Sequence, residues 1–190
     1  EMCIRDRSWA DDRGIRQSRL YAISAGIGFD ALVCELALHA KLKTFLNRIG
    51  LGKLVYLILT VKSMRALQVQ DAYIEFEGGE SYELKDMVFA AAMNQPYEGG
   101  GVPMAPDAKN DDGLLSVIFV EDIPKKKMPR MLLRLLLKKH KKIQGLRLKD
   151  TKSVRIHSDT PLVVHSDGEF CGYRTDIRFE AEKGKLRILC

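Results

Sequence analysis

The residues best suited to chemistry are two carboxylates one residue apart, Asp167 and Glu169, on either side of Gly168. They follow the apolar, β-branched pair Val163-Val164, which is typical of a buried strand. A strand that delivers Asp and Glu to a loop at its end is a common way to position a general acid or base. An Asp-Gly pair is also a common hairpin turn. The pattern by itself therefore leaves both roles open.

The composition indicates one ordinary globular core, with 46% hydrophobic and 29% charged residues among 190. No uncharged apolar run of about 18 residues occurs, so no membrane span is predicted. The charged start has no apolar stretch of the kind found in signal peptides, and we expect a cytoplasmic protein. The four cysteines form no CxxC pair and favour reduced thiols, and the histidine spacing indicates no zinc site.

The net charge of +6 predicts a polyanionic partner, either nucleic acid or an anionic membrane surface. Residues 125–142 carry nine Lys or Arg and no acid, interleaved with Leu and Met, and Pro129 fits the first turn of a helix. Because aromatic base-stacking residues are missing, this basic amphipathic helix favours a membrane surface over nucleic acid. We expect peripheral binding at the inner membrane face. The alternative is a core-packing helix with a solvated basic face, and both can hold together.

Ordered structure is expected from residue 19 onward. Residues 1–18 are polar and aperiodic, and are predicted to be disordered or not native to the fold. Residues 19–26 predict a strand, and Gly26 and Gly28 a turn before a helix over 31–48, with Asp30 as its N-cap. This GxG favours tight strand-to-helix packing over phosphate binding, because the rest of a dinucleotide fingerprint is missing. A second helix is predicted from apolar residues that recur at helical spacing and form one face: Leu54, Leu57, Ile58, Val61 and Met64.

The rest of the chain is mainly strand. Period-two alternation begins near Val69, Gly78-Gly79 predicts a hairpin, and residues 87–93 predict a central strand. The long loop over 95–112 predicts a functional segment, and 114–120 the next strand. Short strands follow to the C-terminus, with a turn at Lys183-Gly184 and with His157 and His165 as ordinary strand residues. The fold class is thus α+β and mainly β, an antiparallel β-sandwich with covering helices.

Four short motifs occur in an order that resembles a known family. They are Gly26-Ile27-Gly28-Phe29-Asp30-Ala31, Asn94 with Gly99-Gly100-Gly101, Pro106-x-Ala108-x-x-x-Asp112-Gly113-Leu114-Leu115, and Asp167-Gly168-Glu169. Together they resemble the C-terminal domain of the diacylglycerol kinase and sphingosine kinase family, and the bacterial soluble diacylglycerol kinases in particular. The resemblance covers residues 19–190. The related NAD kinases share this fold plan.

The resemblance implies transfer of the ATP γ-phosphoryl group to the hydroxyl of diacylglycerol or a similar lipid, which gives a phosphatidic acid. Glu169 is then the first choice of proton acceptor and Asp167 the second. A structural Mg²⁺ is implied at the Asp112 carboxylate and the backbone oxygens of Leu114 and Lys109. Family members bind ATP on an N-terminal domain with a Gly-Gly-Asp-Gly-Thr loop, which this sequence lacks. We therefore expect the C-terminal domain alone, inactive without that partner domain.

Other readings stay open. The chain could be a non-catalytic lipid- or protein-binding β-sandwich, or an NAD kinase-like enzyme whose acceptor is a nucleotide. Taken alone, Asp112-Gly113 is a plain turn. The basic helix favours the lipid kinase, because it has a clear purpose when the substrate lies in a membrane. The identity of the lipid and a homo-oligomeric state are left open by the sequence.

Overall fold

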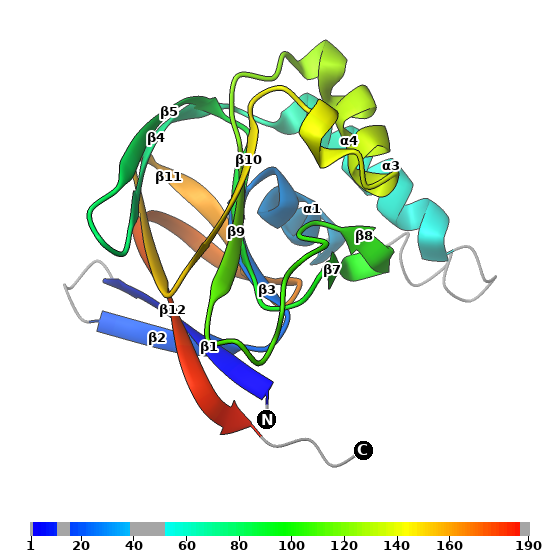
Figure 1. The fold of residues 1–190 in the computed structure, drawn as a ribbon. Coiled ribbons are helices and arrows are strands. Elements are labelled where there is room, and N and C mark those ends of the chain that lie inside the picture. Colours follow the sequence, from blue (N-terminus) through cyan, green and yellow to red (C-terminus); the bar gives the residue numbers. More distant parts are fainter. Residues whose placement is uncertain (1, 11–15, 39–51, 187–190) are drawn as a thin grey trace.

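One strongly curled antiparallel sheet forms most of the molecule (Figure 1). The computed structural model describes residues 2–10, 16–38 and 52–186. Strands follow one another across the sheet in the order β10-β9-β6-β3-β11-β12-β1-β2, and β4 joins β11 and carries β5. Their bounds are β1 (Met2–Ala10), β2 (Arg16–Tyr21), β3 (Ser24–Gly28), β4 (Gln70–Phe76), β5 (Ser81–Met87), β6 (Phe89–Met93), β9 (Leu115–Val120), β10 (Leu146–Thr151), β11 (Ser153–Ser166) and β12 (Glu169–Leu186).

The curl comes from two long strands that change partners along their length. β11 pairs with β4 near Ile156 and with β3 near His165. β12 pairs with β11 over 169–180 and with β1 over 178–186, so the two pairings overlap only at 178–180. Register shifts mark the points where the pairing is interrupted, as expected for bulges that bend a sheet. The predicted short strands are therefore two long ones, and the predicted turn at Lys183-Gly184 lies inside β12.

The prediction that residues 1–18 are disordered is wrong for the described part. Met2–Ala10 forms β1, which pairs with β12 on one side and β2 on the other. Pairing with β12 gives these polar residues backbone hydrogen-bond partners, which an alternation rule cannot detect.

Two hydrophobic cores lie on opposite faces of the central strands. On β6 and β9, Ala90, Val117 and Phe119 face the inside of the curl, whereas Phe89 and Ile118 face the helices. A strand buried on both faces reads as a continuous apolar run, which is why residues 87–93 correctly predicted a central strand.

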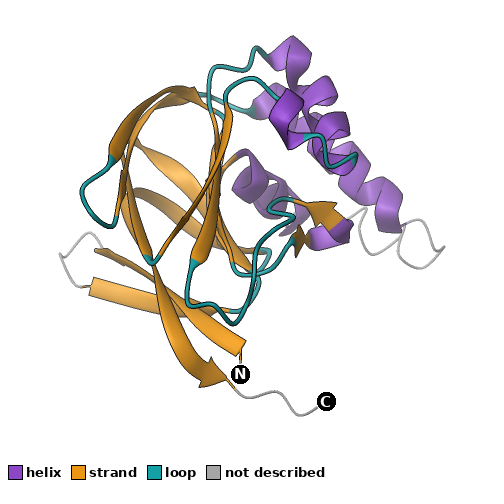
Figure 2. Ribbon diagram, in the orientation of Figure 1, coloured by secondary structure: helices purple, strands orange, loops and turns teal. Residues whose placement is uncertain are grey.

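Three α-helices of the described chain lie on the outer face of this sheet (Figure 2). They are α1 (Phe29–Leu38), α3 (Gly52–Ala66) and α4 (Met128–Leu136). The predicted second helix is confirmed as α3, whereas residues 39–48 of the predicted first helix lie outside the described residues. The basic helix is shorter than predicted, because residues 125–127 and 140–142 are 3₁₀ turns. Within the described helices none is long and apolar enough to cross a membrane.

The predicted loop over 95–112 contains a small hairpin. β7 (Tyr97–Glu98) and β8 (Val102–Pro103) pair across the 3₁₀ turn Gly99–Gly101. β8 contacts α4, and Lys138 at the end of α4 donates a hydrogen bond to the Tyr97 hydroxyl (2.8 Å). The loop therefore holds Glu98 in a fixed place beside the helices.

Candidate active site

The Asp-Gly pair is the tight turn between the two longest strands. Asp167 and Gly168 both have positive φ, 49° and 79°, as a type I′ hairpin requires. The turn joins β11 to β12 with Ser166 opposite Glu169. The motif is therefore a hairpin turn, and this turn also presents its two carboxylates at the end of the sheet.

Asp167 ties this turn to the bend before β3. Its carboxylate accepts hydrogen bonds from the backbone N–H groups of Ala22, Ile23 and Ser24, at 2.9, 2.8 and 3.1 Å. Asn94 fixes the same bend from the other side, since its side-chain amide donates to the Ala22 carbonyl (2.8 Å). The oxygens of Asp167 are thus committed to holding two chain segments together.

Glu169 lies in a different setting. Its side chain is 66% exposed and forms an ion pair with Arg19 on β2. A solvent-exposed ion pair of this kind contributes little stability, about 0–1 kcal/mol. Its carboxylate therefore contributes less to the fold than that of Asp167, and it can approach another molecule.

A pocket of about 540 Å³ opens beside this turn, between the sheet, α1 and α4. Most of its wall is apolar, and Val33, Ala37, Phe89, Met131 and Leu135 are among its lining residues. The polar part of the wall carries four carboxylates: Asp30, Glu98, Asp167 and Glu169. No Lys or Arg lines it within the described residues. An apolar cavity with a few convergent polar groups is the usual form of a ligand site.

A buried histidine stands behind the acidic wall. His165 on β11 is fully buried, and its Nε2 lies 2.9 Å from Asp30 Oδ2 on α1 and 3.4 Å from Glu98 Oε1 on β7. The Ser24 hydroxyl donates to Glu98. Asp30 also accepts a hydrogen bond from the Ala31 N–H (2.7 Å). It is not the predicted N-cap, because α1 already begins at Phe29 and Asp30 lies in its first turn. His165 lies on a strand, as predicted, but its buried contacts with two carboxylates set it apart from an ordinary strand residue.

Burial and neighbouring charge set the protonation of this cluster. Burial lowers the pKa of His165, but the charge and hydrogen bond of Asp30, together with Glu98, outweigh it and raise that pKa to about 9. Burial raises the pKa of Glu98, and the nearby Asp30 and Asp167 add to this, whereas His165 and Ser24 oppose it. Both neighbouring carboxylates therefore favour the protonated form of the ring.

The cluster depends on the glycines of the predicted GxG motif. A Cβ on Gly26 would lie 2.4 Å from Asp30 Oδ2 and 2.9 Å from His165 Nε2, and one on Gly28 would lie 2.6 Å from the Val88 carbonyl. The motif is not the predicted turn, because both glycines belong to β3. Its predicted role in close strand-to-helix packing is supported, since α1 begins at the next residue.

The predicted Mg²⁺ residues lie on the loop before β9 and not on the pocket wall. Asp112 is exposed, and its Oδ1 accepts a hydrogen bond from the Leu114 N–H (2.8 Å), which closes a turn. A carboxylate and the loop carbonyls of Leu114 and Lys109 suit Mg²⁺ chemically. Asp112 belongs to no cluster of three metal-binding side chains in the described part of the chain, so an ion there would retain several waters.

The comparisons with known proteins decide the family. The family described as "YegS C-terminal NAD kinase beta sandwich-like domain" matches residues 23–190. The chain belongs to this family. The resemblance seen in the motifs is thereby confirmed, because the relatives carry diacylglycerol kinase and lipid kinase names.

Two relatives and one solved structure show how far the similarity extends. YtlR of Bacillus subtilis strain 168, provisionally named a lipid kinase, is 29% identical over 163 residues, which are 86% of this chain and 52% of YtlR. A diacylglycerol kinase of Mycobacterium tuberculosis strain H37Rv is 24% identical over 161 residues, 84% of this chain and 48% of that protein. The crystal structure of a provisionally named diacylglycerol kinase from Bacillus anthracis strain Sterne has a TM-score of 0.63 at 18% identity, covering 96% of this chain and 53% of that one.

These comparisons confirm the predicted fold class. The chain spans about half the length of the curated relatives that it matches. The identity to the solved structure is low, so that likeness bears on the fold alone.

Proposed function

We propose that this chain is the lipid-binding half of a kinase that transfers the ATP γ-phosphoryl group to the hydroxyl of diacylglycerol or a similar lipid. The observation that carries the proposal is the apolar pocket of about 540 Å³, whose acidic wall includes Asp167 and Glu169. Such a pocket suits an acceptor with an apolar body and a hydroxyl at its polar end. The names of the relatives support the reaction class, and diacylglycerol would give a phosphatidic acid.

Glu169 is the proposed proton acceptor. The lipid hydroxyl oxygen forms a bond to the γ-phosphorus, the bond from that phosphorus to the bridging oxygen breaks, ADP leaves, and the hydroxyl proton passes to Glu169. Glu169 is favoured over Asp167 because its carboxylate is held by an exposed ion pair with Arg19, whereas the Asp167 carboxylate accepts three backbone hydrogen bonds. Asp167, bound to three backbone N–H groups, is the second choice and positions the turn.

The phosphate charge requires a second domain. Because no Lys or Arg among the described residues lines the pocket, this half is poorly suited to hold ATP. We assign ATP to a partner domain that faces the turn, and a structural Mg²⁺ to the loop of Asp112, Leu114 and Lys109. The apolar wall also favours a lipid over the nucleotide acceptor of an NAD kinase.

The test uses a chimera, in which this chain is fused to the part of the Mycobacterium tuberculosis diacylglycerol kinase that lies outside the matched residues. Transfer of labelled phosphate from ATP to diacylglycerol is then followed in mixed micelles. We expect Glu169→Gln to lower kcat by about 10²- to 10⁴-fold with the fold intact, because a general base contributes about that much. Glu77→Gln is the matched control, since Glu77 is exposed and lies outside the pocket.

Two results would contradict this proposal in different ways. Full activity of the Asp167→Asn, Glu169→Gln double variant would remove both residues from the chemistry. A folded chimera that binds diacylglycerol micelles and forms no product would favour the non-catalytic lipid-binding module.

A further inference from the structure

Three side chains from separate elements bring metal-binding atoms together beside the pocket. Asp30 on α1, Glu98 on β7 and His165 on β11 each contribute one such atom, and these atoms lie within 4.8 Å of one another. We propose that this cluster binds a divalent transition-metal ion of the Zn²⁺ or Mn²⁺ class. The site is separate from the Asp112 loop, and the inference does not depend on the proposed kinase activity.

The distances fit one ion between the three side chains. Bonds of about 2.0–2.2 Å from a metal to nitrogen and oxygen place neighbouring donor atoms roughly 3–4 Å apart. The His165 Nε2 lies 2.9 Å from Asp30 Oδ2 and 3.4 Å from Glu98 Oε1. A donor set of one imidazole and two carboxylates favours Zn²⁺ or Mn²⁺ over Mg²⁺, which prefers oxygen ligands throughout.

Charge balance favours a doubly charged occupant. Two carboxylates share one imidazole here, and the described residues add no Lys or Arg to the wall of this pocket. A divalent cation would balance both carboxylates and leave the imidazole neutral. Buried charge is costly unless it is paired, so the two carboxylates would stabilise a cation at this position.

The surroundings of His165 are independent support for a site. The ring is fully buried, and its Nε2 contacts the carboxylates of Asp30 and Glu98. This ring nitrogen is therefore directed at the cluster. Gly26 lies opposite His165 in the sheet, and any side chain there would occupy the space of the donor atoms.

An ion at this site would be accessible to a pocket ligand. Asp30 and Glu98 both line the pocket, so three protein ligands would hold the ion while one side faces the cavity. Three protein ligands plus one open position is the arrangement of zinc sites that bind a water or a substrate oxygen. The ion would therefore sit where a pocket ligand presents its polar group.

In the test, the 190-residue chain is treated with a chelator and then titrated with Zn²⁺ or with Mn²⁺ in the presence of excess Mg²⁺. Isothermal titration calorimetry measures the binding. The Mg²⁺ occupies sites made of hard oxygens, including any at Asp112. We expect one ion per chain with a dissociation constant in the micromolar range or below. The Co²⁺ form should show visible absorption without a thiolate charge-transfer band, because no cysteine belongs to the proposed ligand set.

Variants assign the ligands. We expect His165→Asn and Glu98→Gln each to weaken binding by about 100-fold or more, since even outer-shell partners contribute 10- to 100-fold. His157→Asn is the matched control, because His157 is an exposed histidine on the same strand. Cys34→Ser, which changes the thiol that lines the pocket, should also leave binding unchanged.

Circular dichroism checks the fold of each variant. If His165→Asn does not fold, Glu98→Gln decides, because Glu98 is only partly buried and the change preserves its shape. The proposal is overturned if the unmodified chain binds neither Zn²⁺ nor Mn²⁺ in the micromolar range. It is equally overturned if Glu98→Gln binds as tightly as the unmodified chain, or if Cys34→Ser abolishes binding.

Discussion

The Asp167 carboxylate is bound by backbone from a distant part of the chain, and this has a measurable consequence for stability. Oδ2 accepts from Ala22, while Oδ1 accepts from Ile23 and Ser24. Asp167→Asn replaces one oxygen with an NH₂ group that must face a backbone N–H. We expect the free energy of unfolding in urea to fall by about 1–3 kcal/mol. Asp159→Asn, an exposed carboxylate on the same strand, should change it by less than about 0.5 kcal/mol. Equal effects of the two changes would contradict this role.

His165 makes the stability of the metal-free chain depend on pH. Its pKa is about 9 in the folded chain against an ordinary value of 6.5, so the folded chain binds this proton more tightly than the unfolded chain. The contribution is complete below about pH 6.5 and is lost as the pH rises towards 9. Its size is on the order of 3 kcal/mol. The raised pKa of Glu98 acts in the same direction from lower pH.

Urea unfolding at several pH values in the presence of a chelator measures this dependence. The His165→Gln variant should lose most of the decline between pH 6.5 and 9. The His157→Gln variant should retain it, because His157 is exposed. A flat profile for the unmodified chain would show that the ring is neutral in the folded state.

The parts of the site that could be predicted are those whose residues are neighbours in the sequence. Asp167 and Glu169 stand beside Gly168 after a β-branched pair, so the sequence correctly predicted a turn with two carboxylates. The partnership of His165 with Asp30 is not local, because 135 residues separate them and only the sheet pairing brings them together. The residues of the GxG motif marked the β3–α1 junction, but the need for Gly26 becomes clear only beside His165.

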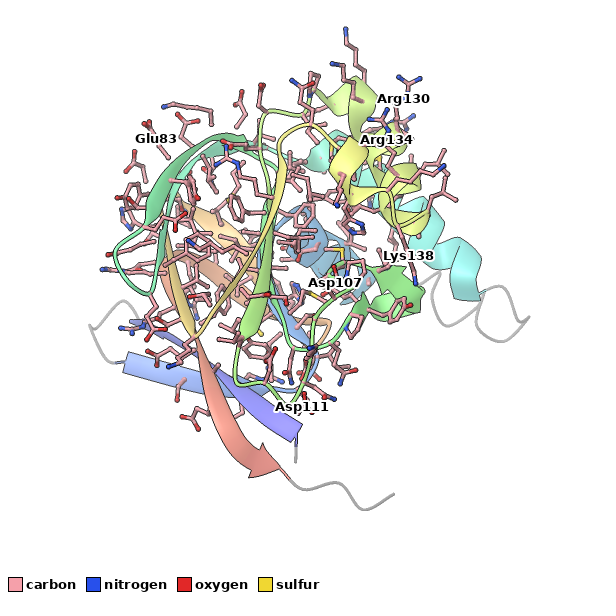
Figure 3. All side chains as sticks on the ribbon, in the orientation of Figure 1. Glu83, Asp107, Asp111, Arg130, Arg134 and Lys138 are labelled. Carbon is pink, nitrogen blue, oxygen red and sulfur yellow. The ribbon has the colours of Figure 1, made fainter. Side chains whose placement is uncertain are left out.

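At the scale of elements, α4 has two different apolar faces. Met131, Leu132 and Leu135 line the pocket, whereas Leu133, Leu136 and Leu137 are 56%, 49% and 53% exposed. Figure 3 shows Arg130, Arg134 and Lys138 following one another along α4 and the turn after it. Core packing and membrane binding, the two alternatives predicted for this helix, are therefore compatible. One face packs against the pocket, and the other combines exposed leucines with basic residues. An anionic lipid surface matches that combination.

The exposed leucines should insert into a membrane surface. We expect sedimentation to show binding to phosphatidylglycerol vesicles, weaker binding to phosphatidylcholine, and a decrease with salt. The Leu133→Ser, Leu136→Ser double variant should bind at least about 10-fold more weakly, because it loses two apolar side chains from the lipid boundary. Leu148→Ser on β10, where the leucine is 41% exposed, is the matched control. Unchanged binding of the double variant would exclude α4 as the docking element.

Element prediction succeeded where burial follows the chain's own periodicity. The central strand β6, the hairpin of β4 and β5, and the helix α3 were all predicted from apolar spacing. β1 was missed because its strand character comes from pairing with β12 and β2. Likewise, the charge run over 125–142 predicted one helix, whereas 3₁₀ turns at 125–127 and 140–142 confine α4 to nine residues.

At the scale of the whole molecule, the pocket is small for the lipid that we propose. A volume of about 540 Å³ is that of a site for a drug-sized ligand. Two long acyl chains therefore extend beyond the pocket. The outer parts of long chains would then stay in the membrane while the hydroxyl reaches the acidic wall.

The limited volume of the pocket predicts how the rate depends on acyl chain length. In mixed micelles, the chimera with the Mycobacterium tuberculosis nucleotide half should show kcat/KM rising over the shortest chains and then reaching a plateau. On the plateau it should change by less than about threefold, because added methylenes remain in the micelle in both the free and the bound state. Ala37→Phe, which places a larger side chain in the pocket wall, should shift the plateau to shorter chains. A steady rise in kcat/KM to eighteen carbons would instead mean that the chains are held entirely by the protein, and that the pocket enlarges when the lipid binds.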